Sequence, residues 1–227
     1  MRFGKIAYLN LLPFDMFIKK YPTPAHFKKF LDLKKSYPAQ LNQQFLKKYI
    51  DAGFISSFAG FESMQKHKAT NAAIIAKGAV WSVIALPKAQ KDDYQSASSN
   101  ALAKILGING EVLIGDRALR YKLSGKEYVD LGEKWWERHH LGFVFGRLCF
   151  NKYATFYTRL AQSFVTKPIK IPHYILQARA QQSHIAPQDI KAYLKHIHYR
   201  LGKKELLALR RFYALARLKG IKKPARF

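Results

Sequence analysis

Cysteine is the scarcest chemistry-bearing residue of this sequence, with one copy among 227 residues. A single thiol cannot form an intrachain disulfide, and it cannot supply a cysteine-based zinc site. That residue, Cys149, lies in the apolar run FVFGRLCF, a context typical of a buried strand residue. Disulfide-stapled scaffolds and zinc modules built on cysteine are therefore excluded.

Long apolar runs are missing as well. The most apolar stretch, AAIIAKGAVWSVIALP, is interrupted by Lys77 and Gly78 and is too short to span a bilayer. The first residues, MRFGKIAYLNLLPF, contain Asn10 and Pro13, and no small-residue cleavage site follows them. We therefore expect a cytoplasmic protein with no membrane partner.

Acidic residues are few: 14 Asp and Glu stand against 40 Lys and Arg, for a formal net charge of +26. Such an imbalance first suggests nucleic-acid binding. The basic residues, however, come as dispersed pairs, and no zinc-finger, RNP or basic-zipper signature accompanies them. We expect a solvated basic surface, or a field that attracts an anionic substrate, and no specific nucleic-acid partner. The basic segment from Gly202 onward keeps the alternative open.

Short apolar runs alternate with helical periodicity along the chain, a pattern typical of α/β proteins. We predict strands in GKIAYL, IDAGFISS, AAIIAKG, VWSVIALP, EVLIGD and FVFGRLCF. After about residue 171 no strand signal remains, and APQDIKAYLKHIHYRLG and KKELLALRRFYALARLKG are predicted helices with apolar stripes. The simplest assembly has one lobe of residues 1–81 plus 168–227 and an inserted lobe of residues 82–167, with crossings near 80–83 and 167–171.

Polar residues gather where the predicted strands end, which is the edge where open α/β sheets bind ligands. Asn10 follows the first strand, although it could equally cap the next helix. Ser96, Ser98 and Ser99 open the helix SASSNALAKILG, where hydroxyls and a helix N-terminus could bind a carboxylate or phosphate. Alternatively, one serine caps that helix and the others face solvent. Further polar strand ends are Ser56, Ser82, Gly115 and Asp116, of which Asp116 could instead cap a helix.

Familiar hydrolase signatures are missing. The sequence contains no HExxH, no paired-carboxylate spacing and no Gly-x-Ser-x-Gly, so zinc and serine hydrolases lack support. His196 and His198 lie two apart on a predicted helix and would not face each other. We expect neither a metal nor a cofactor.

Several segments, taken in order from residue 4 to about 147, resemble the chorismate dehydratases of the futalosine route to menaquinone. GKIAYLNLLPF is similar to the family's Leu-Asn-x-x-Pro motif, and IDAGFISS to its Asp-x-Gly-x-x-Ser segment. SASSNALAKIL resembles its Ser-x-Thr-Ser helix start, and EVLIGDRAL its Leu-Ile-Gly-Asp-x-Ala-Leu motif. Ser98, Gly142 and Gly146 depart from the family's commoner Thr, Pro and Ala.

The resemblance implies a periplasmic-binding-protein type II-like α/β fold with two lobes around a ligand cleft, working as a hydro-lyase. Dianionic chorismate would lose water to give 3-(1-carboxyvinyloxy)benzoate. The implied catalytic residue is Asn10, and the implied substrate-binding residues are Ser56, Ser82, Ser96, Ser98, Ser99, Gly115 and Asp116. Our hypothesis for the proton acceptor is the enolpyruvyl carboxylate of the substrate, with Asp51 or Asp116 as the alternatives.

Two rival functions belong to the same fold. The 1,4-dihydroxy-6-naphthoate synthase of this pathway is less similar, because its Ser-Pro-Cys-Pro-Asn-Asp-like N-terminal signature is missing here. A non-catalytic anion-binding protein is the other rival, and the missing signal peptide argues against it. The sequence predicts no oligomeric state.

Overall fold

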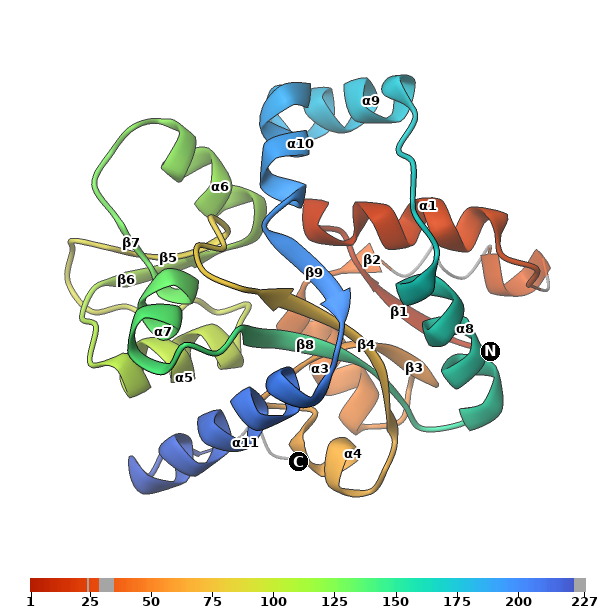
Figure 1. Cartoon of the computed structure of the whole chain (residues 1–227), viewed down its shortest axis with the longest axis horizontal. Coiled ribbons are helices and arrows are strands. Elements are labelled where there is room, and N and C mark those ends of the chain that lie inside the picture. The colour runs from red at the N-terminus through yellow and green to blue at the C-terminus, as the bar shows by residue number, and fades with distance from the viewer. Residues whose placement is uncertain (24, 29–34, 223–227) are drawn as a thin grey trace.

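A computed structural model describes residues 1–23, 25–28 and 35–222, which form two α/β lobes (Figure 1). Within these residues the larger lobe has a six-stranded sheet of order β2-β1-β3-β8-β4-β9, and the smaller lobe a three-stranded sheet of order β6-β5-β7. The strands are β1 (Phe3–Ile6), β2 (Lys35–Ser36), β3 (Ala52–Ser56), β4 (Ala69–Ala76), β5 (Val83–Leu86), β6 (Glu111–Ile114), β7 (Val129–Asp130), β8 (Phe143–Phe150) and β9 (Ile197–Arg200).

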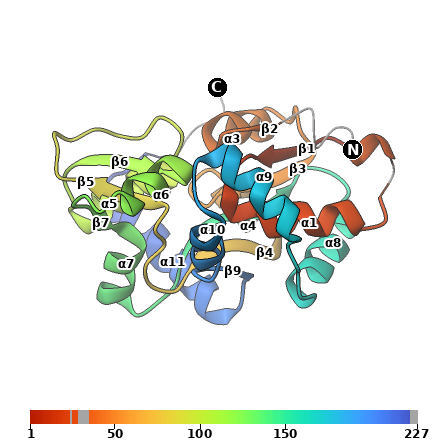
Figure 2. The ribbon, with the colours of Figure 1, turned by 90° about the horizontal axis from the view of Figure 1, so that it is seen from above.

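Helices surround both sheets, as the view from above makes clear (Figure 2). They are η1 (Leu9–Leu11), α1 (Leu12–Lys20), α3 (Pro38–Leu46), α4 (Phe61–Gln65), α5 (Ala97–Leu106), α6 (Gly115–Leu123), α7 (Leu131–His139), α8 (Ala154–Thr166), α9 (His173–Ser183), α10 (Pro187–Leu194) and α11 (Lys203–Leu218). None of the helices in the described ranges is long and apolar enough to cross a membrane.

The larger sheet is mixed. β1 runs parallel to β2 and β3, whereas β8 runs antiparallel to both β3 and β4, and β9 runs antiparallel to β4. Helices α3, α8 and α11 pack on β3, β4 and β8, respectively. Every residue of β1 and β3 is buried, as expected for strands covered on both faces. Each of the six predicted strands overlaps an observed strand, and the predicted helix SASSNALAKILG is α5.

The smaller lobe is inserted between two neighbouring strands of the larger sheet. The chain leaves this sheet after Ala76 and re-enters it at Phe143, and these residues are register partners in the antiparallel β4–β8 pair. At the first crossing, the Asp130 carboxylate accepts hydrogen bonds from the backbone N–H groups of Val80 and Trp81. The same buried carboxylate caps α7, so one side chain fastens the crossing to the smaller lobe.

The expected inserted lobe, residues 82–167, differs from the observed one at its second boundary. β8 is hydrogen bonded to β3 and β4, and α8 packs against β4, so both elements belong with the larger sheet. The return crossing lies at residues 140–142 and not at 167–171. An apolar strand has the same local pattern in either sheet, since its partners are set by residues distant in the sequence.

The expectation of a strand-free segment after residue 171 is wrong. The predicted helix over 186–202 ends at Leu194, and β9 then pairs with β4 at the edge of the larger sheet. Ile197 is buried, while His198 and Arg200 are exposed, which is the alternation of a half-buried strand. Four residues of alternation are too few to stand out beside a helical pattern.

Candidate functional site

A cavity lies between the two lobes, where the polar strand ends meet. Its walls contain six of the predicted site residues, namely Asn10, Ser56, Ser82, Ser96, Ser99 and Gly115. It spans about 550 Å³ when the space open to solvent is counted. Only about 50 Å³ is open to the centres of water molecules, so the lobes lie close together here.

Asn10 lies in the short helix η1, between β1 and α1. Its side chain caps neither η1 nor α1, so the alternative role as a helix cap is wrong. Its backbone carbonyl accepts a hydrogen bond of 2.6 Å from the Tyr199 hydroxyl, which fixes the turn. The Asn10 amide oxygen is buried and has no hydrogen-bond partner among the described residues. Such a group costs about 1–3 kcal/mol, so its place in a cavity wall favours a ligand-binding role.

Ser56 ends β3, and a buried amide holds it. The Asn42 side chain donates to the Ser56 hydroxyl at 2.9 Å and accepts from the Ser56 backbone N–H at 3.1 Å. The hydroxyl oxygen also accepts from the Ala59 backbone N–H at 3.4 Å. No described residue accepts the Ser56 hydroxyl proton, which is left for the cavity.

The serine cluster at the start of α5 divides into two roles. Ser96 is the N-cap: its oxygen accepts from the Ser99 backbone N–H at 3.2 Å, and its hydroxyl donates to the Ser99 oxygen at 2.8 Å. Ser98, in contrast, accepts a 2.9 Å hydrogen bond from the Phe58 backbone N–H of the larger lobe and does not line the cavity. At the other end of the helix, Gly107 has a left-handed conformation and ends α5.

Ser82 and Gly115 lie side by side in the wall. The Gly115 backbone N–H donates to the Ser82 carbonyl at 2.8 Å, and the buried Tyr193 hydroxyl donates to the Ser82 hydroxyl oxygen at 2.8 Å. Gly115 has a φ of +64°, and a Cβ atom there would lie 2.7 Å from the Tyr8 ring. Glycine is therefore needed both for the backbone conformation and for the close approach of Tyr8.

Asp116 and Asp51 lie outside the cavity wall. The Asp116 carboxylate accepts a 3.2 Å hydrogen bond from the Leu9 backbone N–H, in an adjacent pocket, and does not cap α6. Burial raises the pKa of Asp116 above its ordinary value. Asp51 accepts from the Arg2 backbone N–H at 2.7 Å before β3 begins. Ser56 lies five positions further along the extended strand, about 16 Å away.

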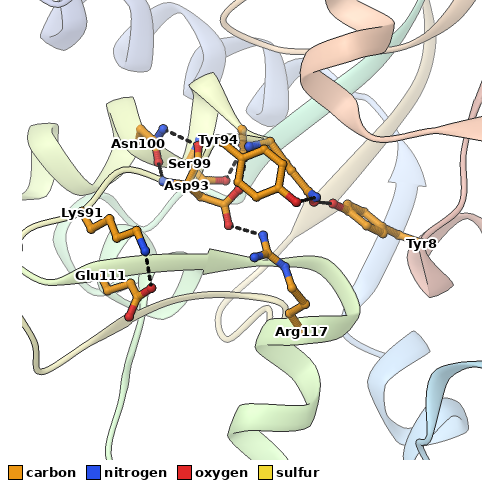
Figure 3. A network of polar contacts seen from close by, with 10 residues as sticks. Tyr8, Lys91, Asp93, Tyr94, Ser99, Asn100, Glu111 and Arg117 are labelled. Atoms are coloured by element: carbon orange, nitrogen blue, oxygen red, sulfur yellow. Dashed lines mark hydrogen bonds and ion pairs between the residues drawn. The ribbon is translucent and has the colours of Figure 1, made fainter.

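Sequence reasoning missed a polar network that joins the lobes beside the cavity (Figure 3). Tyr8, from the larger lobe, donates to the Gln95 side-chain carbonyl, and Gln95 donates to the Tyr94 hydroxyl at 2.6 Å. Arg117 donates to the Asp93 carboxylate at 2.6 Å, and this ion pair ties residues 93–95 to α6. Tyr8 could have been found from its place between β1 and η1, but nothing local marks residues 93–95.

The electrostatic character of this cavity comes from neutral polar groups and helix N-termini. Among the described residues that line it, none has a charged side chain. Helices α5 and α6 both begin at its wall, and helix N-termini favour anions through their free N–H groups and dipoles. Burial is the main cause that raises the pKa of Tyr8, and the nearby negative charge of Asp93 raises it further, so this phenol remains a proton donor. No cluster of three or more His, Cys, Asp or Glu able to hold a metal occurs in the described ranges.

Comparison with known proteins gives consistent results. The chain matches the family model described as menaquinone biosynthesis over residues 1–111 and 84–218. It is similar to a chorismate dehydratase from Campylobacter jejuni, with 39% identity over 215 residues that cover 93% of this chain and 96% of that protein.

Solved structures with the same architecture are more distant in sequence. A protein from Archaeoglobus fulgidus has a TM-score of 0.67 at 15% identity, over 97% of this chain and 98% of its own. A Parabacteroides distasonis protein described as an ABC transporter has a TM-score of 0.55 at 15% identity, over 99% and 96%. The predicted periplasmic-binding-protein-like α/β fold is confirmed, with two lobes around a cavity.

Proposed function

The chain belongs to the menaquinone biosynthesis family and is a homologue of chorismate dehydratase, and on this premise we propose that it removes water from chorismate to give 3-(1-carboxyvinyloxy)benzoate. In this hydro-lyase reaction the ring C–O bond to the hydroxyl and a neighbouring ring C–H bond break. A ring double bond forms, the ring becomes aromatic, and the hydroxyl leaves with a proton as water.

One observation carries the proposal: the interlobe cavity combines free hydroxyl donors with a buried amide oxygen that has no hydrogen-bond partner among the described residues. Chorismate has two carboxylates, which only accept hydrogen bonds, and one ring hydroxyl. Ser82 and Ser99, beside two helix N-termini, suit the carboxylates. The Asn10 amide suits the ring hydroxyl, because no described residue is a hydrogen-bond partner of its oxygen. Phe54 and Phe145 supply apolar walls for the ring.

The composition of the wall also favours a proton acceptor within the substrate. No His, Lys, Asp or Glu is found among the described residues that line the cavity. Asp51 lies at the far end of β3, and Asp116 lies in the adjacent pocket. The enolpyruvyl carboxylate, tethered next to the ring proton, would then remove it. The protein's contribution would be to orient both carboxylates and to stabilise charge on the departing oxygen. We also propose that this reaction takes place in the cytoplasm.

Purified protein incubated with chorismate provides the test. The expected result is loss of chorismate with the appearance of the aromatic product in proton NMR spectra, without any added cofactor. Binding of chorismate without turnover, measured by calorimetry, would instead support the non-catalytic anion-binding alternative. Neither binding nor turnover would refute chorismate as the substrate and favour another reaction of the pathway, such as that of the dihydroxynaphthoate synthase.

A further inference from the structure

Three serine hydroxyls of the cavity share one arrangement: each accepts a hydrogen bond from a buried neighbouring side chain. Ser56 accepts from the Asn42 amide at 2.9 Å, and Ser82 accepts from the Tyr193 phenol at 2.8 Å. Ser99 accepts from Ser96 at 2.8 Å. Asn42 and Tyr193 do not line the cavity themselves, and both are almost completely buried.

This arrangement determines which way each hydroxyl proton points. A serine hydroxyl has one proton and two acceptor lone pairs, and it rotates to suit its partners. When a fixed donor occupies the lone-pair side, the proton turns away from that donor. No described residue accepts the protons of Ser56, Ser82 or Ser99, so these protons are available to the cavity. The wall therefore presents donors to a ligand.

The burial of Asn42 and Tyr193 makes this orientation of the hydroxyl protons stable. Tyr193 is 1% exposed, and its phenol has Ser82 as its partner among the described residues. Asn42 is 3% exposed and holds Ser56 twice, through its amide nitrogen and its amide oxygen. Breaking either contact would leave a buried polar group unpaired, which is costly.

We infer that Asn42 and Tyr193 are positioning residues that turn the hydroxyl protons of Ser56 and Ser82 toward the cavity, and that they thereby make it selective for carboxylates over neutral groups of the same shape. The identity of the natural substrate rests on the proposed function, whereas the orientation of the hydroxyls does not. A hydrogen bond to a carboxylate is stronger than one to a neutral acceptor, so correct orientation favours anions.

Tyr193→Phe tests this inference, because it removes only the phenolic oxygen and keeps the buried ring. The probes are isophthalate, an aromatic dianion, and isophthalamide, its neutral analogue, with binding measured by calorimetry. We expect isophthalate to bind about ten-fold more weakly, at the low end for a lost charge-assisted hydrogen bond, and isophthalamide affinity to change by less than about two-fold. With chorismate, KM should rise about ten-fold while kcat changes much less.

Tyr157→Phe is the matched control, since Tyr157 is as deeply buried but its hydroxyl has no hydrogen-bond partner in the described part of the chain. It should leave both affinities unchanged. Asn42→Asp is a second variant: its carboxylate would accept the Ser56 proton and turn it away from the cavity, again weakening isophthalate selectively. Thermal melts establish that each variant is folded.

The outcomes separate this inference from the proposed function. If the wild type converts no chorismate but its isophthalate affinity still depends on Tyr193, the function fails and the positioning role stands. Equal isophthalate affinities in wild type and Tyr193→Phe overturn the positioning role, even if chorismate is converted. The same holds if the wild type binds no isophthalate, or if isophthalamide binding weakens as much as isophthalate binding.

Discussion

Asn10 is the side chain on which the proposed elimination depends most directly. Asn10→Asp keeps the shape of the side chain but places a negative charge opposite a dianionic substrate. Because Asn10 caps no helix, the folded structure should tolerate the change. We expect turnover to fall at least about a hundred-fold, comparable to the loss of a transition-state hydrogen-bond donor, with a nearly unchanged melting temperature. Steady-state kinetics and thermal melts measure both.

The way in which Asn10→Asp fails is informative. Slow turnover with normal chorismate binding would support a role in orienting the reacting groups. Lost binding would indicate charge repulsion, and Asn10→Ala, which adds no charge, would then separate the two effects. An Asn10→Asp variant with wild-type turnover would contradict any catalytic role for this residue.

Single residues were predictable from the sequence where a strand end or a helix start marked them. Asn10, Ser56 and Ser82 are near strand ends, and all three line the cavity. The sequence could not separate Ser98 from Ser99, because neighbours on a helix point in different directions and only the opposite lobe decides which one meets Phe58. Tyr193 was hidden in a different way, since its role depends on a contact across 111 residues.

Helix α5 gives a prediction at the scale of an element. Ser98 and Ser99 are adjacent, yet one joins the lobes and the other lines the cavity. Ser98→Ala should leave the buried Phe58 N–H unpaired and lower the free energy of unfolding by about 1–3 kcal/mol, with little change in KM. Ser99→Ala should leave the free energy of unfolding nearly unchanged and raise KM about ten-fold or more. Urea denaturation and kinetics on the two variants provide mutual controls.

An equal effect of the two substitutions on KM would mean that the whole helix start contacts substrate, as the sequence alone suggested. An effect of Ser98→Ala on KM alone would place the binding surface on the other side of α5. Either outcome would contradict the division of roles seen in the structure.

Helices and strands differ in how far the local sequence pattern predicts them. The buried strands and capped helices before β8 carry strong signals, such as the Ser96 cap and the Gly107 stop of α5. β9 is an edge strand of four residues, and its pairing with β4 is long-range. The sheet to which β8 belongs is likewise decided by β3 and β4, not by its own residues.

At the scale of the molecule, the closeness of the lobes implies that they must part to admit substrate. The cavity has about 50 Å³ open to water centres, room for about four waters at roughly 12 Å³ each. The Tyr37 and Tyr94 rings, one from each lobe, pack edge to face next to the network around Tyr8, with their centroids 5.8 Å apart. Joining these two positions covalently should therefore block turnover.

A double variant, Tyr37→Cys with Tyr94→Cys, makes this testable with a bis-methanethiosulfonate cross-linker, which forms a disulfide with each cysteine by releasing methanesulfinate, and these disulfides can be reduced. We expect bridging to lower turnover at least ten-fold and reduction to restore it. The native Cys149 should not react, because it is 1% exposed and burial raises the pKa of its thiol to about 12. Each single variant, treated alike, is the control. Full turnover in the bridged protein would show that the lobes need not separate.

The net charge of +26 gives a further prediction for the whole surface. Its Lys and Arg pairs are dispersed along the chain, so we expect only weak nucleic-acid binding that falls steeply as salt rises from 50 to 200 mM. Fluorescence anisotropy with labelled DNA or RNA measures this. Binding tighter than about 10⁻⁸ M at physiological salt, the range of specific binders, would require a second function.

The position of β4 in its sheet has a consequence for how the protein is made. β4 lies between β8 and β9 in the sheet, and both of these strands are synthesised after it. From the last residue of β4, the first residue of β8 follows 67 positions later and the first residue of β9 follows 121 positions later. Until then the apolar residues and both edges of β4 are unpaired, a state that promotes aggregation. Translation therefore runs ahead of folding in this chain, and a holding chaperone would find its binding site in the nascent β3–β4 region.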